Sequence, residues 1–188
     1  GHFARLLTER FPLLPVEEDG RLNDPRLREN FIERIFAHLR LRLFLADDAS
    51  PGGHVRFHTT QKLTLLAPSP MRYPELGRMV AGAGKAEWDT LRDAYARLFM
   101  ETLGRLATPG RHANVMEHLL GYLKDHLDRA DKQELVALVR DYRKGLVPLV
   151  VPLTLLNHHL RRHPVADWVH EQAYLEPYPK ELMLRNHV

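Results

Sequence analysis

Apolar residues recur along most of this chain at intervals of three and four positions, the spacing that places them on one face of an α-helix. The clearest run follows Asn23-Asp24-Pro25, where Asp24 suits the N-cap and Pro25 the first helical turn. The run continues to about Ala46, before a Ser-Pro-Gly-Gly turn, with one face made by Leu27, Phe31, Ile35, Leu39 and Leu43. This pattern predicts a long amphipathic helix.

The same periodicity predicts further helices, separated by Pro and Gly, at about 54–67, 74–82, 88–106, 111–129, 131–144, 149–163 (or 152–163) and 165–175. Gly82-Ala83-Gly84 breaks the second of these. Asp131 with Glu134 resembles a capping box, and Gly145 fits a C-terminal stop. No stretch shows sustained strand alternation. The predicted fold class is therefore all-α, a single bundle-like domain of about seven to nine helices.

The N-terminal part of the chain has a different composition from the rest. Residues 11–24 contain prolines, four acids and one Gly, which predicts an extended connector, and their apolar side chains indicate that it packs on another surface. We therefore assign 1–24 to an interdomain connector or the end of a preceding domain, and 25–188 to the helical domain. The longest run without charged residues, 145–160, is short and interrupted by prolines, so no membrane span is expected.

Charge and cysteine content limit the kinds of ligand and catalytic chemistry that this chain can have. The net charge is +3, with 12 His, and Arg supplies twenty-one of the 27 Lys and Arg residues. Arg offers the planar, forked donors that suit phosphate, although genome composition alone explains such a bias equally well. There is no Cys, which excludes thiolate catalysis, disulfides and cysteine-ligated iron–sulfur clusters within this chain. We expect no cofactor in this chain and a cytoplasmic location.

Two segments, 111–124 and 142–159, combine Arg, Lys, His and Asn with apolar runs. In the first, Asn114, His118 and Gly121 fall on one helical stripe, and a helix-interior Gly would let a ligand or another helix approach closely. Such side chains can donate to phosphates or base edges, or can belong to a face that is solvated or packed against a neighbouring helix. With the basic C-terminal residues they give the candidate nucleic-acid-binding set: Arg111, His112, Asn114, His118, Lys124, Arg143, Lys144, His158, His159, Arg161, Arg162, Arg185, Asn186 and His187.

Metal and catalytic signals are weaker. His159 and His163 share a helical face, as do His54 and His58, and such pairs bind zinc when a third ligand joins them. Neither pair carries the Glu that a zinc hydrolase places directly after its first His. No pair of carboxylates stands out as an acid–base couple, and 82–85 does not form a Gly-rich phosphate loop. We assign no catalytic and no metal residues.

Several long motifs resemble the YbgA-like helical domain, and they run in order across nearly the whole chain: FARLLTERFPLLPVEEDGRLNDPRLRENFIER, FHTTQK, YPELGRMVA, HANVMEHLLGYLK, YRKGLVPLVVPLTLLNHH and ELMLRNHV. In that family the domain is found behind a thiouracil-desulfidase-type domain, which binds an iron–sulfur cluster and removes sulfur from thiolated uracil, including 4-thiouridine in tRNA. Two positions depart from the family pattern, because Gln61 and Pro68 stand where the family tends to have His. The other motif positions in the candidate set agree with it.

The resemblance implies an accessory module, not catalytic by itself, that binds tRNA or another RNA and serves a desulfidase domain in cis. The iron–sulfur cluster would belong to that partner domain. Two alternatives stay open: a structural domain that docks the desulfidase half or dimerises, and a small His-based metal-dependent enzyme. The oligomeric state does not follow from the sequence.

Overall fold

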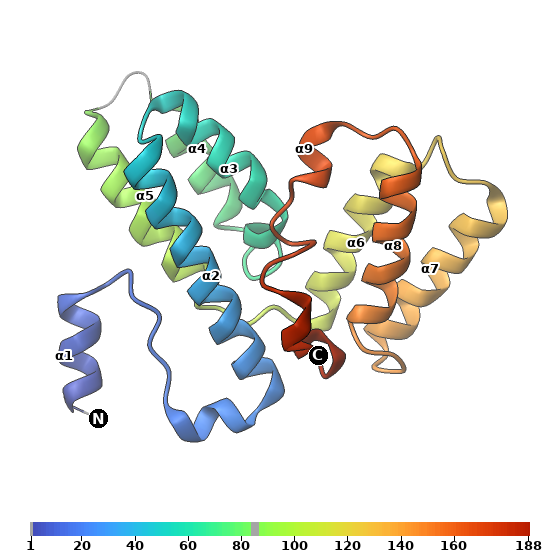
Figure 1. Cartoon of the computed structure of the whole chain (residues 1–188), viewed down its shortest axis with the longest axis horizontal. Helices are drawn as coiled ribbons and strands as arrows, with labels where there is room; N and C mark the ends of the chain where they lie inside the picture. The colour runs from blue at the N-terminus through green and yellow to red at the C-terminus, as the bar shows by residue number, and fades with distance from the viewer. Residues whose placement is uncertain (1, 84–86) are drawn as a thin grey trace.

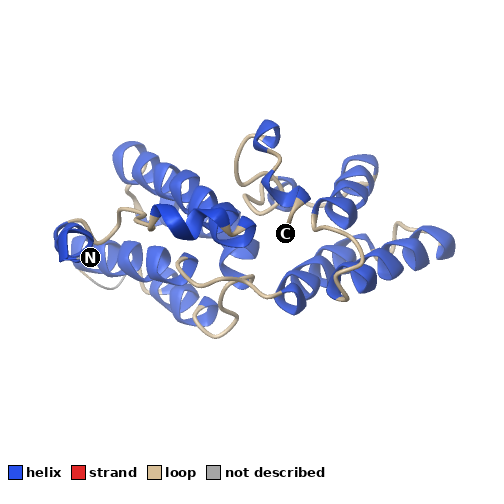
Figure 2. Ribbon diagram, turned by 90° about the horizontal axis from the view of Figure 1, so that it is seen from below, coloured by secondary structure: helices blue, strands red, loops and turns tan. Residues whose placement is uncertain are grey.

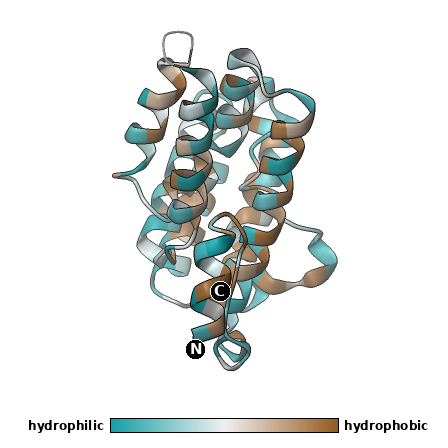
Figure 3. Cartoon of the chain, turned by 90° about the vertical axis from the view of Figure 1, so that its left-hand side faces the viewer, coloured by the Kyte–Doolittle hydropathy of each residue, from teal (hydrophilic) through white to brown (hydrophobic). Residues whose placement is uncertain are grey.

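The computed structural model describes residues 2–83 and 87–188, and every regular element within them is helical (Figures 1 and 2). The predicted all-α class is confirmed. Apolar and hydrophilic residues alternate around the helices (Figure 3), because each helix has one face that can be buried against its neighbours. The buried residues form two separate cores, so the helices make two bundles side by side (Figure 1).

The first bundle contains α2 (Pro25–Asp47), α3 (Pro51–Leu66), α4 (Tyr73–Ala81) and α5 (Trp88–Leu103). Asp24 caps α2 as predicted, since its Oδ1 accepts hydrogen bonds from the backbone N–H groups of Arg26 and Leu27. Its core combines aliphatic side chains with the aromatic rings of Phe44, Phe57, Tyr95 and Phe99. Phe44 and Phe57 stack with ring centroids 4.9 Å apart, which joins α2 to α3.

The second bundle contains α6 (Pro109–Leu123), α7 (Arg129–Arg143), α8 (Val150–Arg162) and the single turn α9 (Asp167–His170). Its core is mainly aliphatic, with Leu119, Leu135 and Leu156 fully buried. The cap of α7 differs from the prediction: Asp128, rather than Asp131, occupies the N-cap and accepts the Asp131 N–H.

Helix α3 belongs to both cores. Leu65 packs in the first core, whereas Leu63 on the same helix packs in the second. The side-chain amide of Gln172 fastens the second bundle to α3, because its Oε1 accepts the Leu63 N–H at 3.0 Å and its Nε2 donates to the Thr59 carbonyl at 2.7 Å. The two bundles therefore share one central helix.

The C-terminal segment, with the short turns η2 (Lys180–Leu182) and η3 (Leu184–Asn186), runs between the two bundles (Figure 1). The Leu149 N–H donates to the Val188 carbonyl at 2.8 Å, which holds the segment against the start of α8. Arg185 extends from η3 to Glu29 on α2. This segment thus links the two bundles through contacts with α2 and α8.

The connector predicted to be extended over 11–24 is extended only in part, because it contains the 3-10 turn η1 (Asp19–Asn23). Before it the chain forms α1 (His2–Arg10). Leu13 packs against the first core, which confirms that the connector contacts another surface.

Three helices are shorter than the sequence pattern predicts. Helix 88–106 ends at Leu103, 111–129 ends at Leu123, and 165–175 is reduced to 167–170. The break at 82–84 lies partly outside the described residues, as does Lys85 of the 82–85 stretch.

Candidate nucleic-acid interface

Three of the predicted binding residues are buried and face the core instead of the surface: His112, His159 and Arg185. The His112 Nδ1 lies 2.8 Å from the Tyr174 hydroxyl, and burial lowers the His112 pKa to about 3, so its ring is neutral at physiological pH. The His159 Nδ1 lies 4.0 Å from an Asp131 carboxylate oxygen. The structure therefore corrects the assignment of these three side chains to an exposed binding surface.

Arg185 lies at the centre of a polar cluster between the bundles. Its Nε donates to Glu29 Oε1 at 3.3 Å, and its Nη1 donates to the Tyr174 carbonyl at 2.7 Å. The Tyr178 hydroxyl donates to the same Glu29 oxygen at 2.8 Å. The Arg185 guanidinium is buried and is held through its Nε and Nη1, although its Nη2 has no hydrogen-bond partner in the described parts of the chain. It is therefore not exposed to a phosphate, and its role is to fix the C-terminal segment to α2.

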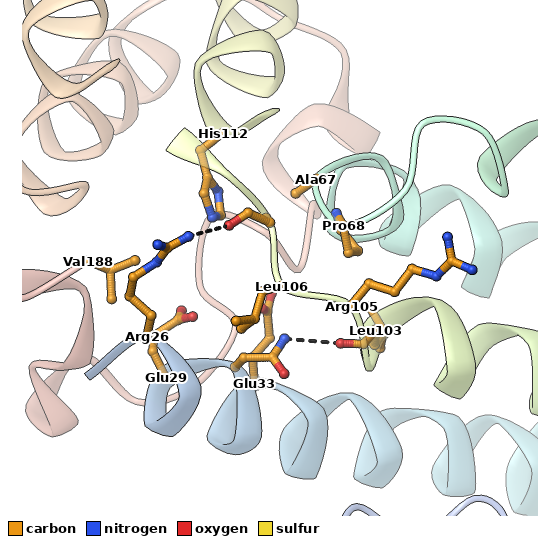
Figure 4. Close-up of a pocket in the computed structure, with 12 residues that line it drawn as sticks. Arg26, Glu29, Glu33, Ala67, Pro68, Leu103, Arg105, Leu106, His112 and Val188 are labelled. Carbon is orange, nitrogen blue, oxygen red and sulfur yellow. Dashed lines mark hydrogen bonds between the residues drawn. The ribbon is translucent and has the colours of Figure 1, made fainter. Parts of the chain in front are cut away.

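A small cavity adjoins this cluster (Figure 4), with a volume of about 20 Å³. Across it the Arg26 guanidinium donates to the Ala107 carbonyl at 3.2 Å. Burial, followed by the nearby Glu29 carboxylate, raises the pKa of Glu33 to about 8. Such a cavity has room for about one water molecule, so it is too small for a substrate, and we interpret the cluster as a structural junction.

The exposed candidate cations fall into two groups at opposite ends of the second bundle. Helices that follow one another along the chain, α6 and α7 and then α7 and α8, run antiparallel (Figure 1). One end therefore carries Arg111, Arg143 and Lys144, and the other carries Lys124, Arg161 and Arg162. Helix α7 has 15 residues, so at 1.5 Å per residue the two ends lie roughly 22 Å apart. The exposed cations of the candidate set therefore do not gather on one surface.

The remaining candidates are also dispersed. His118 is exposed in the middle of α6 and Asn114 is partly buried one turn earlier. His158 is exposed on α8, while Asn186 and His187 lie at the end of the C-terminal segment. Among them, only Asn186 lines one of the larger hollows described next.

A groove of about 810 Å³ runs between α2, α8 and the C-terminal segment. It is lined by Arg40 from α2, Asn157 and Arg161 from α8, and Lys180 from η2. The Arg40 Nη2 donates to the Glu176 carbonyl at 3.0 Å, which orients this side chain. Within the described residues, neither Arg161 nor Lys180 forms an ion pair.

The groove contains residues that the candidate set omitted. Arg40, Asn157 and Lys180 are absent from that set, whereas Arg161, Arg185 and Asn186 were included. Asn157 directly precedes His158 in the motif YRKGLVPLVVPLTLLNHH, so its position in the sequence could have indicated a place in the site. Arg40 had none, because it is 121 positions from Arg161 and only the fold brings the two together. Glu176 and Glu181 also line the groove and reduce its positive potential.

The histidines at the end of the second bundle do not form a metal centre. The rings of His159 and His163 are nearly parallel, with centroids 5.9 Å apart, and His126 stacks on His163 at 6.0 Å. Stacked rings do not direct their nitrogens at a common point, as a zinc site requires. No group of three or more His, Asp or Glu in the described parts of the chain is arranged to hold a metal ion.

No helix within 2–83 and 87–188 is long and apolar enough to cross a membrane.

Comparison with known proteins gives a family but no activity. Residues 62–179 match the family described as "Protein of unknown function (DUF1722)". The chain is 33% identical over 168 residues to "Uncharacterized protein YbgA" of Escherichia coli (strain K12), a match that covers 88% of this chain and 98% of that protein. No solved structure matches.

Proposed function

The chain belongs to the DUF1722 family of proteins of unknown function, and we propose that it is an accessory module that binds RNA, in particular tRNA, on behalf of a desulfidase domain. The observation that supports this proposal is the groove between α2, α8 and the C-terminal segment. Arg40, Arg161 and Lys180 converge there from three elements, and a polynucleotide is held chiefly through such contacts to its phosphates. The proposal also places the protein in the cytoplasm, with tRNA.

The association with a desulfidase domain is inferred from the motif resemblance described above. The match to YbgA covers 98% of that protein, which leaves it no room for a second domain of comparable size. We therefore propose that the module can serve its desulfidase partner either in the same chain or as a separate protein. This chain would supply RNA affinity, and the partner would supply the iron–sulfur cluster and the chemistry.

A filter-binding titration with tRNA over a salt series tests the RNA-binding role. We expect roughly micromolar affinity at low salt that weakens steeply as salt rises. Arg161→Gln combined with Lys180→Gln removes two groove cations, and we expect the slope of log affinity against log salt to fall by roughly two.

Arg143→Gln combined with Lys144→Gln is the matched control, because it removes the same charge at the far end of the second bundle. We expect it to leave most of the affinity intact. If wild type fails to bind tRNA at low salt, or if both double variants lose affinity equally, the groove is not the binding site.

A docking or dimerisation role is the second candidate. Ile35, Leu39 and Leu43 form a stripe on α2 that stays exposed, with Leu43 52% accessible. Light scattering of the protein alone, and mixed with a separately produced desulfidase domain, distinguishes this role from RNA binding. A stable complex that Leu39→Lys abolishes, together with indifference to tRNA, would favour docking.

A further inference from the structure

Gln61 on α3 has a buried side-chain oxygen without a hydrogen-bond partner in the described parts of the chain. The residue is only 2% exposed, and its Nε2 makes one long contact, 3.4 Å, to Thr60 Oγ1. A buried acceptor left unpaired costs free energy, and native proteins contain few of them. The neighbouring amide of Gln172, in contrast, has both its oxygen and its nitrogen in hydrogen bonds.

Gln61 lines a hollow of about 490 Å³, which we call the Gln61 recess and define by Arg40, Thr60, Gln61, Asn157 and Arg161 with the 170–176 segment. The volume lies within the range of about 300–1,000 Å³ that is typical of small-ligand sites. The recess adjoins the groove, since Arg40, Asn157 and Arg161 line both. A ligand in the groove therefore has direct access to it.

The recess contains side chains that suit a nucleotide, beside the acidic Glu171 and Glu176. Two guanidinium groups, on Arg40 and Arg161, are suited to a phosphate. The Gln61 amide, which lines the recess, offers an acceptor next to a weakly engaged donor, the arrangement with which Gln and Asn read a base edge in pairs of hydrogen bonds. Asn157 adds a second amide from α8.

We propose that the Gln61 recess binds a single nucleotide turned out of the strand that lies in the groove. Arg40 and Arg161 hold its phosphate, and Gln61 Oε1 accepts a hydrogen bond from an N–H on the base. Extruding a base from its stack costs a few kcal/mol, which the pocket contacts offset. This inference deepens the proposed RNA-binding function and rests on it.

Uridine 5′-monophosphate is the probe, and 3-methyluridine 5′-monophosphate is its matched partner because methylation removes the one N–H on the ring. Binding is measured by NMR titration of the whole protein, with ribose 5-phosphate as a third ligand. We expect uridine 5′-monophosphate to bind at least about fivefold more tightly than either of the other two. Equal affinity for all three ligands, or no binding of uridine 5′-monophosphate, overturns the proposal.

Gln61→Met keeps the side-chain length and removes the polar atoms, and Gln133→Met makes the same change at an exposed position on α7. We expect Gln61→Met to lose the preference for uridine 5′-monophosphate over its 3-methyl form, and Gln133→Met to retain it. An unchanged preference in Gln61→Met overturns the proposal. If Gln61→Met does not fold, Arg161→Gln, which alters an exposed side chain, must lower the affinity for all three phosphate ligands.

The same samples separate this inference from the proposed function. If tRNA binds while uridine 5′-monophosphate does not, the recess proposal fails and the groove proposal stands. If the mononucleotide binds with the expected preference while tRNA does not, the RNA-binding role fails and the recess remains a mononucleotide site.

Discussion

Arg185 and Glu29 are both charged and both almost completely removed from solvent, at 7% and 5% exposure. Replacing one partner leaves the other as a buried charge without its counterion, which typically costs about 3–5 kcal/mol. We expect Arg185→Met to lower the free energy of unfolding by this amount, measured by urea denaturation. Arg143→Ala, at an exposed site, should change it by less than about 0.5 kcal/mol. A small effect for Arg185→Met would show that the junction contributes little.

Glu33 makes the free energy of unfolding depend on pH between about 4.5 and about 8. Its pKa is 4.5 in a free side chain and about 8 in the fold, so between these values the folded state holds a proton that the unfolded state has lost. The free energy of unfolding should therefore fall as pH rises from about 4.5 to about 8. Glu33→Gln should flatten this limb of the stability profile, measured by thermal melts across pH. A profile identical to wild type would contradict the shift.

Buried histidines give the opposite slope in acid. Burial lowers the pKa of His54 and of His58 to about 4, from 6.5 in a free side chain. As pH falls below 6.5 the unfolded state takes up protons that the folded state resists, so stability is progressively lost down to about pH 4. His58→Gln should weaken this loss of stability in acid while leaving the Glu33-dependent fall up to about pH 8 in place, and the same melts measure both.

The sequence gives the chemistry of each side chain but does not indicate whether that side chain is buried or exposed. His112 and Arg185 lie in recognised motifs, and their polarity suggested the surface. Their burial depends on partners far away in sequence, since Glu29 and Arg185 are 156 positions apart. Residue type indicates which bonds a side chain can make, but the fold decides whether water or protein makes them.

Within the helices, Gly121 shows how a sequence signal can be tested. A Cβ added at this position would meet nothing within 4 Å, so no part of the described chain requires a glycine there. We expect Gly121→Ala to raise the free energy of unfolding by about 1 kcal/mol, because Ala favours helix. Gly53→Ala is the contrast: its Cβ would lie 2.1 Å from the Asp48 carbonyl oxygen, so it should destabilise. A tRNA affinity that falls in Gly121→Ala would show that a ligand needs the space.

The sequence predicted which segments form helices better than it predicted the residues at which those helices begin and end. The Asp24-Pro25 start was predicted because cap and first turn are both local. Asp128 and Asp131 each fit a cap three residues before another acid, and the sequence alone could not choose between them. The 165–175 segment was predicted to be helical, but its backbone is used elsewhere, since the Ala173 N–H donates to the Thr60 carbonyl at 2.9 Å.

For the molecule as a whole, the shared helix α3 should couple the two cores. Leu63 and Leu65 are both fully buried, one in each core. We expect Leu63→Ala and Leu65→Ala each to lower the free energy of unfolding by about 2–5 kcal/mol. Each should lower the midpoint of one unfolding transition, which far-ultraviolet circular dichroism and tryptophan fluorescence report together. Two separate transitions, each sensitive to only one variant, would show that the bundles unfold independently.

The all-α class followed from periodicity, but the division into two bundles did not. Periodicity shows that a helix has an apolar face, not which helix covers it. The groove has the same origin: Arg40 and Arg161 line it together only because the C-terminal segment joins α2 to α8. The groove and the adjoining recess thus depend on contacts between distant segments, which a single sequence does not reveal.

The sharing of α3 has a practical consequence for recombinant work. A fragment cut to the family match, 62–179, would begin inside α3 and would discard α2 together with Arg185. Truncation at those limits would expose apolar surface on the retained helices. It would also remove the Thr59 carbonyl, which accepts a hydrogen bond from the side-chain amide of Gln172. Shortened versions should therefore keep at least 24–188, and insolubility of a narrower piece would say nothing about the intact protein.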